Sequence, residues 1–426
     1  MLIQLPRTLH TVLDFTLVPA LLVSGLSLTA VVHLCTYFWI RPPFSLKRHL
    51  IVNIARVGLT IGDLSVFPGL GVVPQRDARE QTVLSNWYTK SPDTDVDVRI
   101  IEPLSKDVPR LEIIERVKGK VGEAPVPGFM VAPAGTALWA RAAPGERVVL
   151  HLVGGGYVTG HPLETHGVFS LVDITRGRVF SANYRKSLDD ATAFPASLLD
   201  SLAGWQFLVH ELGFAPRNIT LAGESAGGNA VLALTRYLDE LEQHGYTALG
   251  LPAGMILAAV RVADPLAFPL LTPTPTDILP QPWSDMTCSF PSIKANKYTD
   301  YLMDLSVYAI PSHTRHYSNQ LSDAYFSPAL SMHGDDPHWK RLASARVAVH
   351  VSGGTAEALW DEIVALVQTM QAAGVDVAFA QLALGVHCDY LIKDFAVMQP
   401  DLAYTWPAVK QGWIEYFEAL DKRGYN

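Results

Sequence analysis

One serine in this chain lies where a nucleophile could be generated. Residues 223–227 read Gly-Glu-Ser-Ala-Gly and stand between a β-rich run at 219–222 and a helical pattern at 226–244. A sharp turn from strand to helix would expose the hydroxyl of Ser225, and the flanking glycines remove the Cβ atoms that would clash there. The positive end of the helix dipole favours a developing oxyanion. The pattern predicts a nucleophilic serine, and a glycine-rich turn with a capping serine is the alternative.

Three consecutive glycines supply a second chemical element. The strand expected at 148–153 runs into Gly154, Gly155 and a third glycine. Consecutive glycines permit close backbone approach, so their N–H groups can point at a substrate oxygen. We predict that the N–H groups of Gly154, Gly155 and Ala226 form an oxyanion hole. The alternative, a phosphate cradle, is disfavoured because the loop lacks the Gly-Lys-Ser/Thr ending of nucleotide-binding loops.

An activated serine needs a histidine, and the histidine needs an orienting carboxylate. Glu357 follows the strand expected at 347–351, and His387 follows the last one, at 377–382. This gives the order serine, acid, histidine, which is typical of one large class of hydrolases. We predict His387 as the base and Glu357 as the acid, with Asp361 as the alternative acid. This chemistry requires no metal and no organic cofactor.

The elements that must position these residues alternate regularly after about residue 126. Short Val-, Ile- and Leu-rich runs are followed by helical patterns, which predicts a mostly parallel sheet covered by helices on both faces. The carboxyl ends of parallel strands share one edge of the sheet. The candidate residues therefore fall on the same edge.

Composition excludes several classes of protein. The chain has 426 residues, of which 49% are hydrophobic and 17% charged, and its net charge is −8. Disordered proteins have low hydrophobicity and high charge, and nucleic-acid-binding proteins normally show a basic excess, so neither class fits. The three cysteines lie far apart, which argues against a disulfide framework or a cysteine zinc site.

The N-terminal segment has the pattern of a membrane anchor. Residues 15–40 contain no Asp, Glu, Lys or Arg, and about 20 apolar residues suffice to cross a bilayer. Tyr37 and Trp39 stand at one end, where aromatic rings favour the membrane interface. We predict a single transmembrane helix at 17–40, in the endoplasmic reticulum membrane. A hydrophobic hairpin packed on the enzyme surface is the alternative.

The side of the membrane stays open. Basic residues after the segment place the globular part in the cytoplasm by the positive-inside rule. Use of the glycosylation sequon at Asn218 would instead require a lumenal domain.

Together these motifs resemble the hormone-sensitive-lipase-like branch of the α/β-hydrolase fold (fold-3 family), over about residues 120–400. The resemblance is closest to fungal-type steryl acetyl hydrolases and arylacetamide-deacetylase-like enzymes. It implies Ser225 as nucleophile, His387 as base and Glu357 at the position usually held by Asp, in an enzyme that cleaves carboxylic esters. The motifs that carry it are Gly154–Tyr157, Asn183–Arg185, Gly223–Asn229, Pro282–Asp285, Asp300–Leu302 and Ser327-Pro328.

Two departures from the family pattern stand out. The family loop usually begins with a histidine that supports it from behind, but here Val153 occupies that position and His151 lies two residues earlier. The stretch 260–281 interrupts the expected path from strand to the Pro-Trp turn, contains five prolines and lacks periodicity. A retained intron and a genuine surface loop both explain it.

We therefore expect an N-terminal membrane anchor at 1–45, a helical cap segment at 46–125 and an α/β-hydrolase domain at 126–426. The expected function is hydrolysis of a small hydrophobic or acetylated ester through an acyl-enzyme. An enzyme of a biosynthetic pathway that catalyses acyl transfer or carbon–carbon chemistry, and a non-catalytic small-molecule receptor, are the alternatives. The expected partners are this small molecule and a membrane, not nucleic acid.

Overall fold

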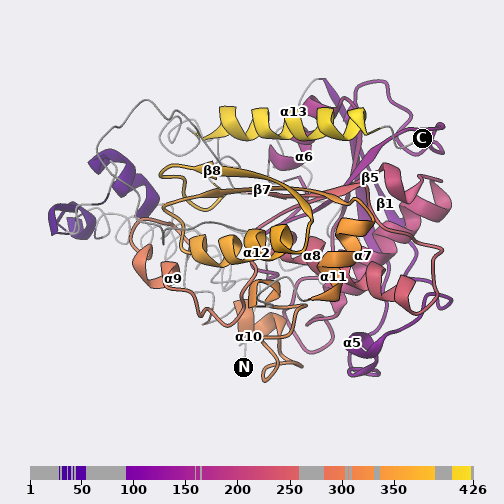
Figure 1. Ribbon diagram of the computed structural model, residues 1–426, viewed down its shortest axis with the longest axis horizontal. Coiled ribbons are helices and arrows are strands. Elements are labelled where there is room, and N and C mark those ends of the chain that lie inside the picture. Colours follow the sequence, from indigo (N-terminus) through magenta and orange to yellow (C-terminus); the bar gives the residue numbers. More distant parts are fainter. Residues whose placement is uncertain are drawn as a thin grey trace, which may run out of the picture.

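The computed structural model describes residues 28, 31–35, 37–39, 42, 45–53, 93–158, 160–163, 166–258, 283–302, 306, 309–330, 336–388 and 405–423. Its centre is an eight-stranded sheet in the order β1-β2-β4-β3-β5-β6-β7-β8 (Figure 1). The strands are β1 (Thr94–Ile101), β2 (Val126–Pro133), β3 (Val148–Leu152), β4 (Arg178–Ala182), β5 (Ile219–Glu224), β6 (Gly254–Ala258), β7 (Ala348–Gly354) and β8 (Asp376–Leu382). Among the strands that the structure describes, only β2 runs opposite to the others, so the predicted, mostly parallel sheet is confirmed.

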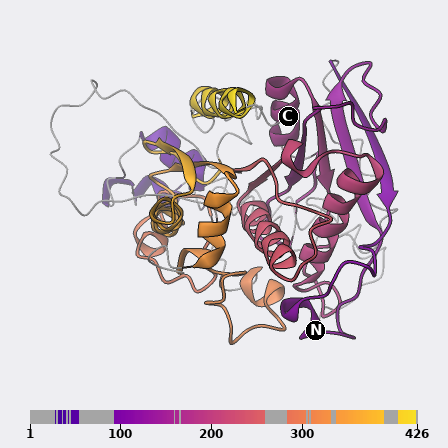
Figure 2. The ribbon, with the colours of Figure 1, turned by 45° about the vertical axis from the view of Figure 1, so that its right-hand side comes forward.

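Helices cover both faces of the sheet (Figures 1 and 2). One face packs against α7 (Ala196–Gln206), α8 (Ala226–Gln243), α11 (Pro337–Ser344) and α12 (Trp360–Ala372), and the other against α6 (His166–Thr175) and α13 (Trp406–Lys422). The strands β3, β4 and β5 are buried at every residue, which explains their continuous apolar sequences. The remaining short elements are α5 (Glu112–Glu115), the π-helical turn at Phe207–Glu211, the 3-10 turns at Pro216–Asn218 and Pro328–Leu330, α9 (Ser292–Ala295) and α10 (Ala309–His313).

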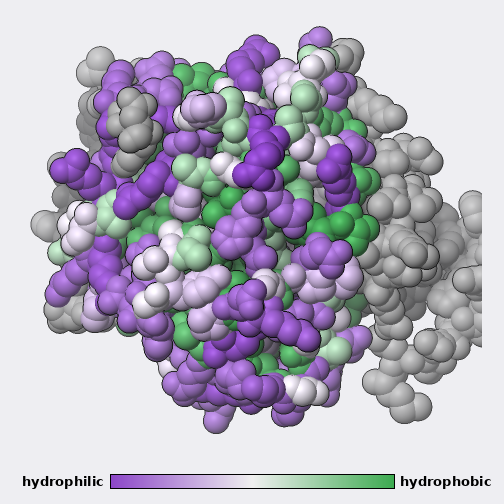
Figure 3. Space-filling view, turned by 90° about the vertical axis from the view of Figure 1, so that its right-hand side faces the viewer, coloured by the Kyte–Doolittle hydropathy of each residue, from purple (hydrophilic) through white to green (hydrophobic). Residues whose placement is uncertain are grey.

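The first strand changes part of the expected domain division. Residues 94–101 pair with β2 along their whole length, so this stretch belongs to the sheet and not to a cap. β1 is an edge strand, and most of its residues are exposed. Figure 3 views this side of the molecule, where hydrophilic side chains cover much of the surface.

The predicted transmembrane helix at 17–40 is not found. Among the residues that the structure describes, no helix is both long and apolar enough to cross a bilayer. Most of the predicted anchor lies outside the described residues. The same holds for the whole of the stretch 260–281, which interrupts the family pattern.

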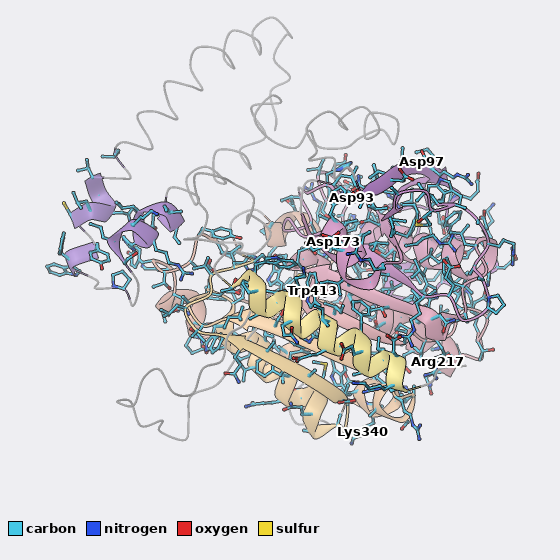
Figure 4. All side chains as sticks on the ribbon, turned by 90° about the horizontal axis from the view of Figure 1, so that it is seen from above. Asp93, Asp97, Asp173, Arg217, Lys340 and Trp413 are labelled. Atoms are coloured by element: carbon cyan, nitrogen blue, oxygen red, sulfur yellow. The ribbon has the colours of Figure 1, made fainter. Side chains whose placement is uncertain are left out.

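A helix at residues 46–53 packs against the carboxyl edge of the sheet. The guanidinium of Arg48 donates a hydrogen bond of 2.7 Å to the carbonyl oxygen of Leu384 in the loop after β8. Figure 4 shows the described N-terminal helices at the end of the molecule away from Arg217 and Lys340, which precede β5 and β7. Buried apolar residues join this helix to the neighbouring loops, namely Val52, Tyr301, Ala356 and Val386.

The packing of α7 on the sheet gives a test of the fold. A Cβ atom on Gly204 would lie 2.8 Å from the Cβ of Ala182 in β4, which is too close without a shift of the backbone. We expect Gly204→Ala to lower the free energy of unfolding by about 1–3 kcal/mol through overpacking, measured by urea denaturation. Gly122→Ala, where an added Cβ meets nothing within 4 Å, is the control. Equal stability of the two variants would contradict the described packing of α7.

Candidate active site

Ser225 occupies the sharp turn between β5 and α8. Its backbone angles, φ 54° and ψ −123°, are unusual for a residue with a side chain. A Cβ on Gly223 would lie 2.3 Å from the carbonyl oxygen of Gly227, and one on Gly227 would lie 1.9 Å from that of Leu152. The turn therefore forms only with glycine at both positions, and it lifts the serine to the edge of the sheet.

His387 and Glu357 meet Ser225 at this edge. The Nε2 atom of His387 lies 2.8 Å from Oγ of Ser225, and its Nδ1 atom lies 3.2 Å from Oε2 of Glu357. The second carboxylate oxygen of Glu357 accepts a hydrogen bond of 2.9 Å from the N–H of Gly354. The side chains of His387 and Glu357 are both buried. The three residues thus form a continuous hydrogen-bonded row.

Asp361 lies elsewhere. Its carboxylate accepts a hydrogen bond of 2.7 Å from the N–H of Ser292, and its own N–H donates to the Ser292 hydroxyl at 2.9 Å. These contacts tie the first turn of α12 to α9. The structure therefore brings Glu357, and not the alternative acid, to the histidine.

Asp300 is a buried carboxylate beside the same histidine, and no role for it was predicted from the sequence. One of its oxygens accepts from the N–H of His387 at 3.0 Å, and the other from the N–H of Ala358 at 2.8 Å. It thereby ties together the loops that carry the histidine and Glu357. Ligand atoms of Asp300, Glu357 and His387 lie within 4.8 Å of one another, but these hydrogen bonds account for the cluster without a cation.

Burial sets the electrostatics of the row. It raises the pKa of Glu357 to about 7, against the opposing hydrogen bond from His387. Burial alone would lower the pKa of His387, yet its neighbours Cys388 and Glu357 raise it above the ordinary value of 6.5. Cys388 is a neutral thiol near pH 7, because burial raises its pKa to about 11. The carboxylate of Glu357 is therefore the charge that favours the imidazolium form of His387.

The glycine loop after β3 lies against Ser225, but its three predicted donors are not equivalent. The N–H of Gly154 donates to Oε1 of Glu224 at 3.3 Å and is thus occupied. Among the described residues, the N–H groups of Gly155 and Ala226 donate to no acceptor. Gly155 has φ 109°, a conformation that favours glycine. Of the three predicted donors, Gly155 and Ala226 are therefore the ones with a free N–H among the described residues, and the oxyanion hole itself stays a prediction.

The rest of the loop is packed between α8 and α10. The ring of Tyr157 stacks on His313 with centroids 3.6 Å apart, and its hydroxyl donates to Asn229 at 2.7 Å. The hydroxyl of Tyr184 donates to the carbonyl oxygen of Val153. Both tyrosines belong to motifs of the family resemblance, Gly154–Tyr157 and Asn183–Arg185, and no local sequence pattern reveals these long-range contacts.

Solved structures with a similar fold include several esterases. An esterase from the bacterial hormone-sensitive lipase family is 20% identical, has a TM-score of 0.56, and the match covers 89% of this chain and 98% of that one. Carboxyl esterase 2 from the mycorrhizal fungus Tuber melanosporum is 15% identical and has a TM-score of 0.56, and the match covers 78% of this chain and 89% of that one. A hormone-sensitive-lipase homologue from a metagenome library is 16% identical and has a TM-score of 0.55, and the match covers 86% of this chain and 96% of that one. No curated protein matches the chain.

Residues 149–391, more than half of the chain, match the family described as alpha/beta hydrolase fold. This range contains the turn at Ser225, the glycine loop and the loops that carry Glu357 and His387. The match agrees with the strand order and with the likeness to solved esterases. The chain therefore belongs to this α/β-hydrolase family.

Proposed function

We propose that this protein is a serine hydrolase that cleaves carboxylic esters. The observation that carries the proposal is the 2.8 Å hydrogen bond between His387 Nε2 and the hydroxyl of Ser225. Proton transfer over such a distance turns a weak alcohol nucleophile into an attacking alkoxide. Membership of the α/β-hydrolase family and the esterases among the similar solved structures support the same reaction.

The proposed reaction has two halves. His387 takes the proton of Ser225, and the serine oxygen attacks the ester carbonyl, whose oxygen is held by the N–H groups of Gly155 and Ala226. His387 then gives its proton to the departing alcohol and leaves an acyl-serine. Water, deprotonated by the same histidine, releases the acid and restores the enzyme. Glu357 holds the imidazole in the required orientation throughout.

The proposed substrate is a small hydrophobic or acetylated ester, such as an acetylated sterol. This finer assignment comes from the sequence resemblance to steryl acetyl hydrolases and arylacetamide-deacetylase-like enzymes. Acyl transfer or carbon–carbon chemistry on the same serine and a non-catalytic receptor are the alternatives. The ratio of transfer to hydrolysis products in water with added alcohol separates acyl transfer from hydrolysis, and reaction with a fluorophosphonate separates enzyme from receptor.

The nucleophile is tested by Ser225→Ala. We expect the wild type to be labelled by a fluorophosphonate probe and to hydrolyse short-chain p-nitrophenyl and sterol esters. The variant should lose labelling, and kcat should fall by at least about 10⁴-fold because no other group forms the acyl-enzyme. Ser292→Ala, at a buried serine bonded to Asp361, is the control. Labelling that survives in Ser225→Ala would contradict the proposal.

The acid is tested by the pH dependence of kcat/KM. Because the pKa of His387 is raised in the folded protein, the histidine stays protonated and inactive up to a higher pH than an ordinary one. Activity should therefore fall as the pH drops through this raised value, above pH 6.5. Glu357→Gln removes the charge that raises it, so the acid limb should move to lower pH, while kcat falls by about 10²- to 10⁴-fold.

Asp361→Asn serves as the comparison for this profile. Asp361 contacts Ser292 and not the histidine, so this variant should keep the acid limb of the wild type even where its stability is lower. If the acid limb of the pH profile shifted in Asp361→Asn and stayed at the wild-type pH in Glu357→Gln, the acid would be Asp361 and not Glu357.

We also propose that the N-terminal segment holds the enzyme at a membrane surface, where hydrophobic esters partition. The support is a group of exposed apolar side chains in the described part of this segment, namely Leu28, Val31, Val32, Leu34, Phe38 and Trp39. A membrane favours such a surface, because burying it removes apolar area from water.

Vesicle flotation tests this location. The full chain should float with phosphatidylcholine–phosphatidylserine vesicles, and Phe38→Glu with Trp39→Glu should reduce the bound fraction at least about 10-fold. The control pair is Val96→Glu with Ile100→Glu, which alters exposed apolar residues on β1. Equal flotation of the two double variants would refute membrane attachment through residues 28–39.

A further inference from the structure

We propose that Glu224 and His151 form a buried pair without net charge that holds the oxyanion loop in its active orientation. The pair takes the place of the family histidine that Val153 replaces. Both act as positioning residues, since neither touches the hydroxyl of Ser225 in the described contacts. This inference rests on the proposed esterase function and assigns the means by which the loop is held.

The loop is fixed through one peptide group. The carbonyl oxygen of Val153 and the N–H of Gly154 belong to the same peptide unit. The first accepts from the hydroxyl of Tyr184, and the second donates to Oε1 of Glu224. Because both ends of this unit are bound, its plane cannot rotate freely, and the chain is anchored one residue before the N–H of Gly155.

His151 holds the carboxyl group of Glu224 from the neighbouring strand. The Oε2 atom of Glu224 lies 2.9 Å from Nε2 of His151, which belongs to the neighbouring strand β3. Nδ1 of His151 lies 3.0 Å from the hydroxyl of Ser181 on β4, and this hydroxyl donates to the carbonyl oxygen of His151. All three side chains are almost fully buried. The row thus runs from β4 through β3 to the turn at Ser225.

A hydrogen count gives the charge that we propose for the pair. In this proposal the single hydroxyl proton of Ser181 goes to the carbonyl oxygen of His151, 3.0 Å away, and Nδ1 of His151 carries the hydrogen of its contact with Ser181. The contact between Nε2 and Oε2 then needs a further proton, held by one partner or the other. In either arrangement, imidazolium with carboxylate or imidazole with carboxylic acid, the net charge is zero.

This neutrality matters because of where Glu224 lies. A Cβ on Gly154 would be 3.3 Å from both Cγ of Glu224 and Cβ of Ser225, so the carboxyl group lies directly behind the oxyanion loop. An uncompensated carboxylate there would repel the negative oxygen that forms in the transition state. His151 supplies the compensating proton, and Glu224 can then hold the loop without opposing the reaction.

The test uses His151→Asn in the full chain. An asparagine amide lies near the position of Nδ1, so it can keep the bond to Ser181 while it leaves Glu224 unpaired. We expect kcat for p-nitrophenyl acetate to fall about 30- to 100-fold with KM changed less than about 3-fold. The inhibition constant of a phenyl trifluoromethyl ketone, which forms a tetrahedral adduct with an oxyanion, should rise by a similar factor.

The double variant His151→Asn with Glu224→Gln separates charge from packing. Glutamine keeps an acceptor for the N–H of Gly154 but carries no charge, so the double variant should recover at least about 10-fold in kcat over His151→Asn alone. His350→Asn is the matched control, because this imidazole is also buried in the sheet and its Nε2 has no hydrogen-bond partner in the described part of the chain. It should change kcat less than about 3-fold.

Three outcomes would overturn the inference. A double variant no more active than His151→Asn would remove the charge argument. Unchanged affinity for the ketone in a variant with reduced kcat would remove the link to the oxyanion. If His151→Asn does not fold, His151→Gln is used instead, because its amide reaches the position of Nε2. Activity of His151→Gln equal to that of the wild type would then contradict a role of the Glu224–His151 pair. Failure of the wild type to cleave any ester would instead refute the proposed function itself.

Discussion

The close approach of two backbones at Gly227 is the constraint that places the nucleophile beside the glycine loop, and the rest of the site is arranged around this pair. The first turn of α8 lies so near the end of β3 that any Cβ on Gly227 would overlap the carbonyl oxygen of Leu152. This contact brings the glycine loop, which follows β3, against the turn that carries Ser225. The same closeness forces the serine into a conformation that residues with side chains rarely adopt. This steric contact thus brings the nucleophile and the glycine loop together, and the hydrogen bond from Gly154 to Glu224 then orients the loop.

The other half of the site depends on hydrogen bonds rather than on close packing. The loops after β7 and β8 carry Glu357 and His387, and a loop has few contacts of its own to hold a side chain in place. Asp300 supplies this order, because its two oxygens bind one N–H in each loop. A buried carboxylate bound in this way orients both loops at once, and it adds a second acidic group near the histidine, besides Glu357.

Sequence reasoning reached the fold and the three central residues because each leaves a local mark. The turn at Ser225 requires glycines at fixed spacing, and Glu357 and His387 directly follow apolar strands. It could not foresee that Gly154 donates to Glu224, since two residues 70 positions apart along the chain show no common pattern. The same holds for Asp300, whose partner His387 is 87 residues away. The predicted cap segment at 46–125 included the residues of β1, which belong to the sheet. The strand was missed because an exposed edge strand lacks a continuous apolar run.

The helix at 46–53 has a practical meaning for anyone who shortens this protein. Arg48 binds the backbone of the loop that leads to His387, and Val52 fills an apolar cluster with Val386 from the same loop. Cutting the chain after the apolar N-terminal stretch, a common step in preparing enzymes for crystallisation, must therefore spare residue 46 onward. A cut a few residues later would leave the histidine loop without its outer support and yield a protein whose poor turnover reflects the cut and not the enzyme.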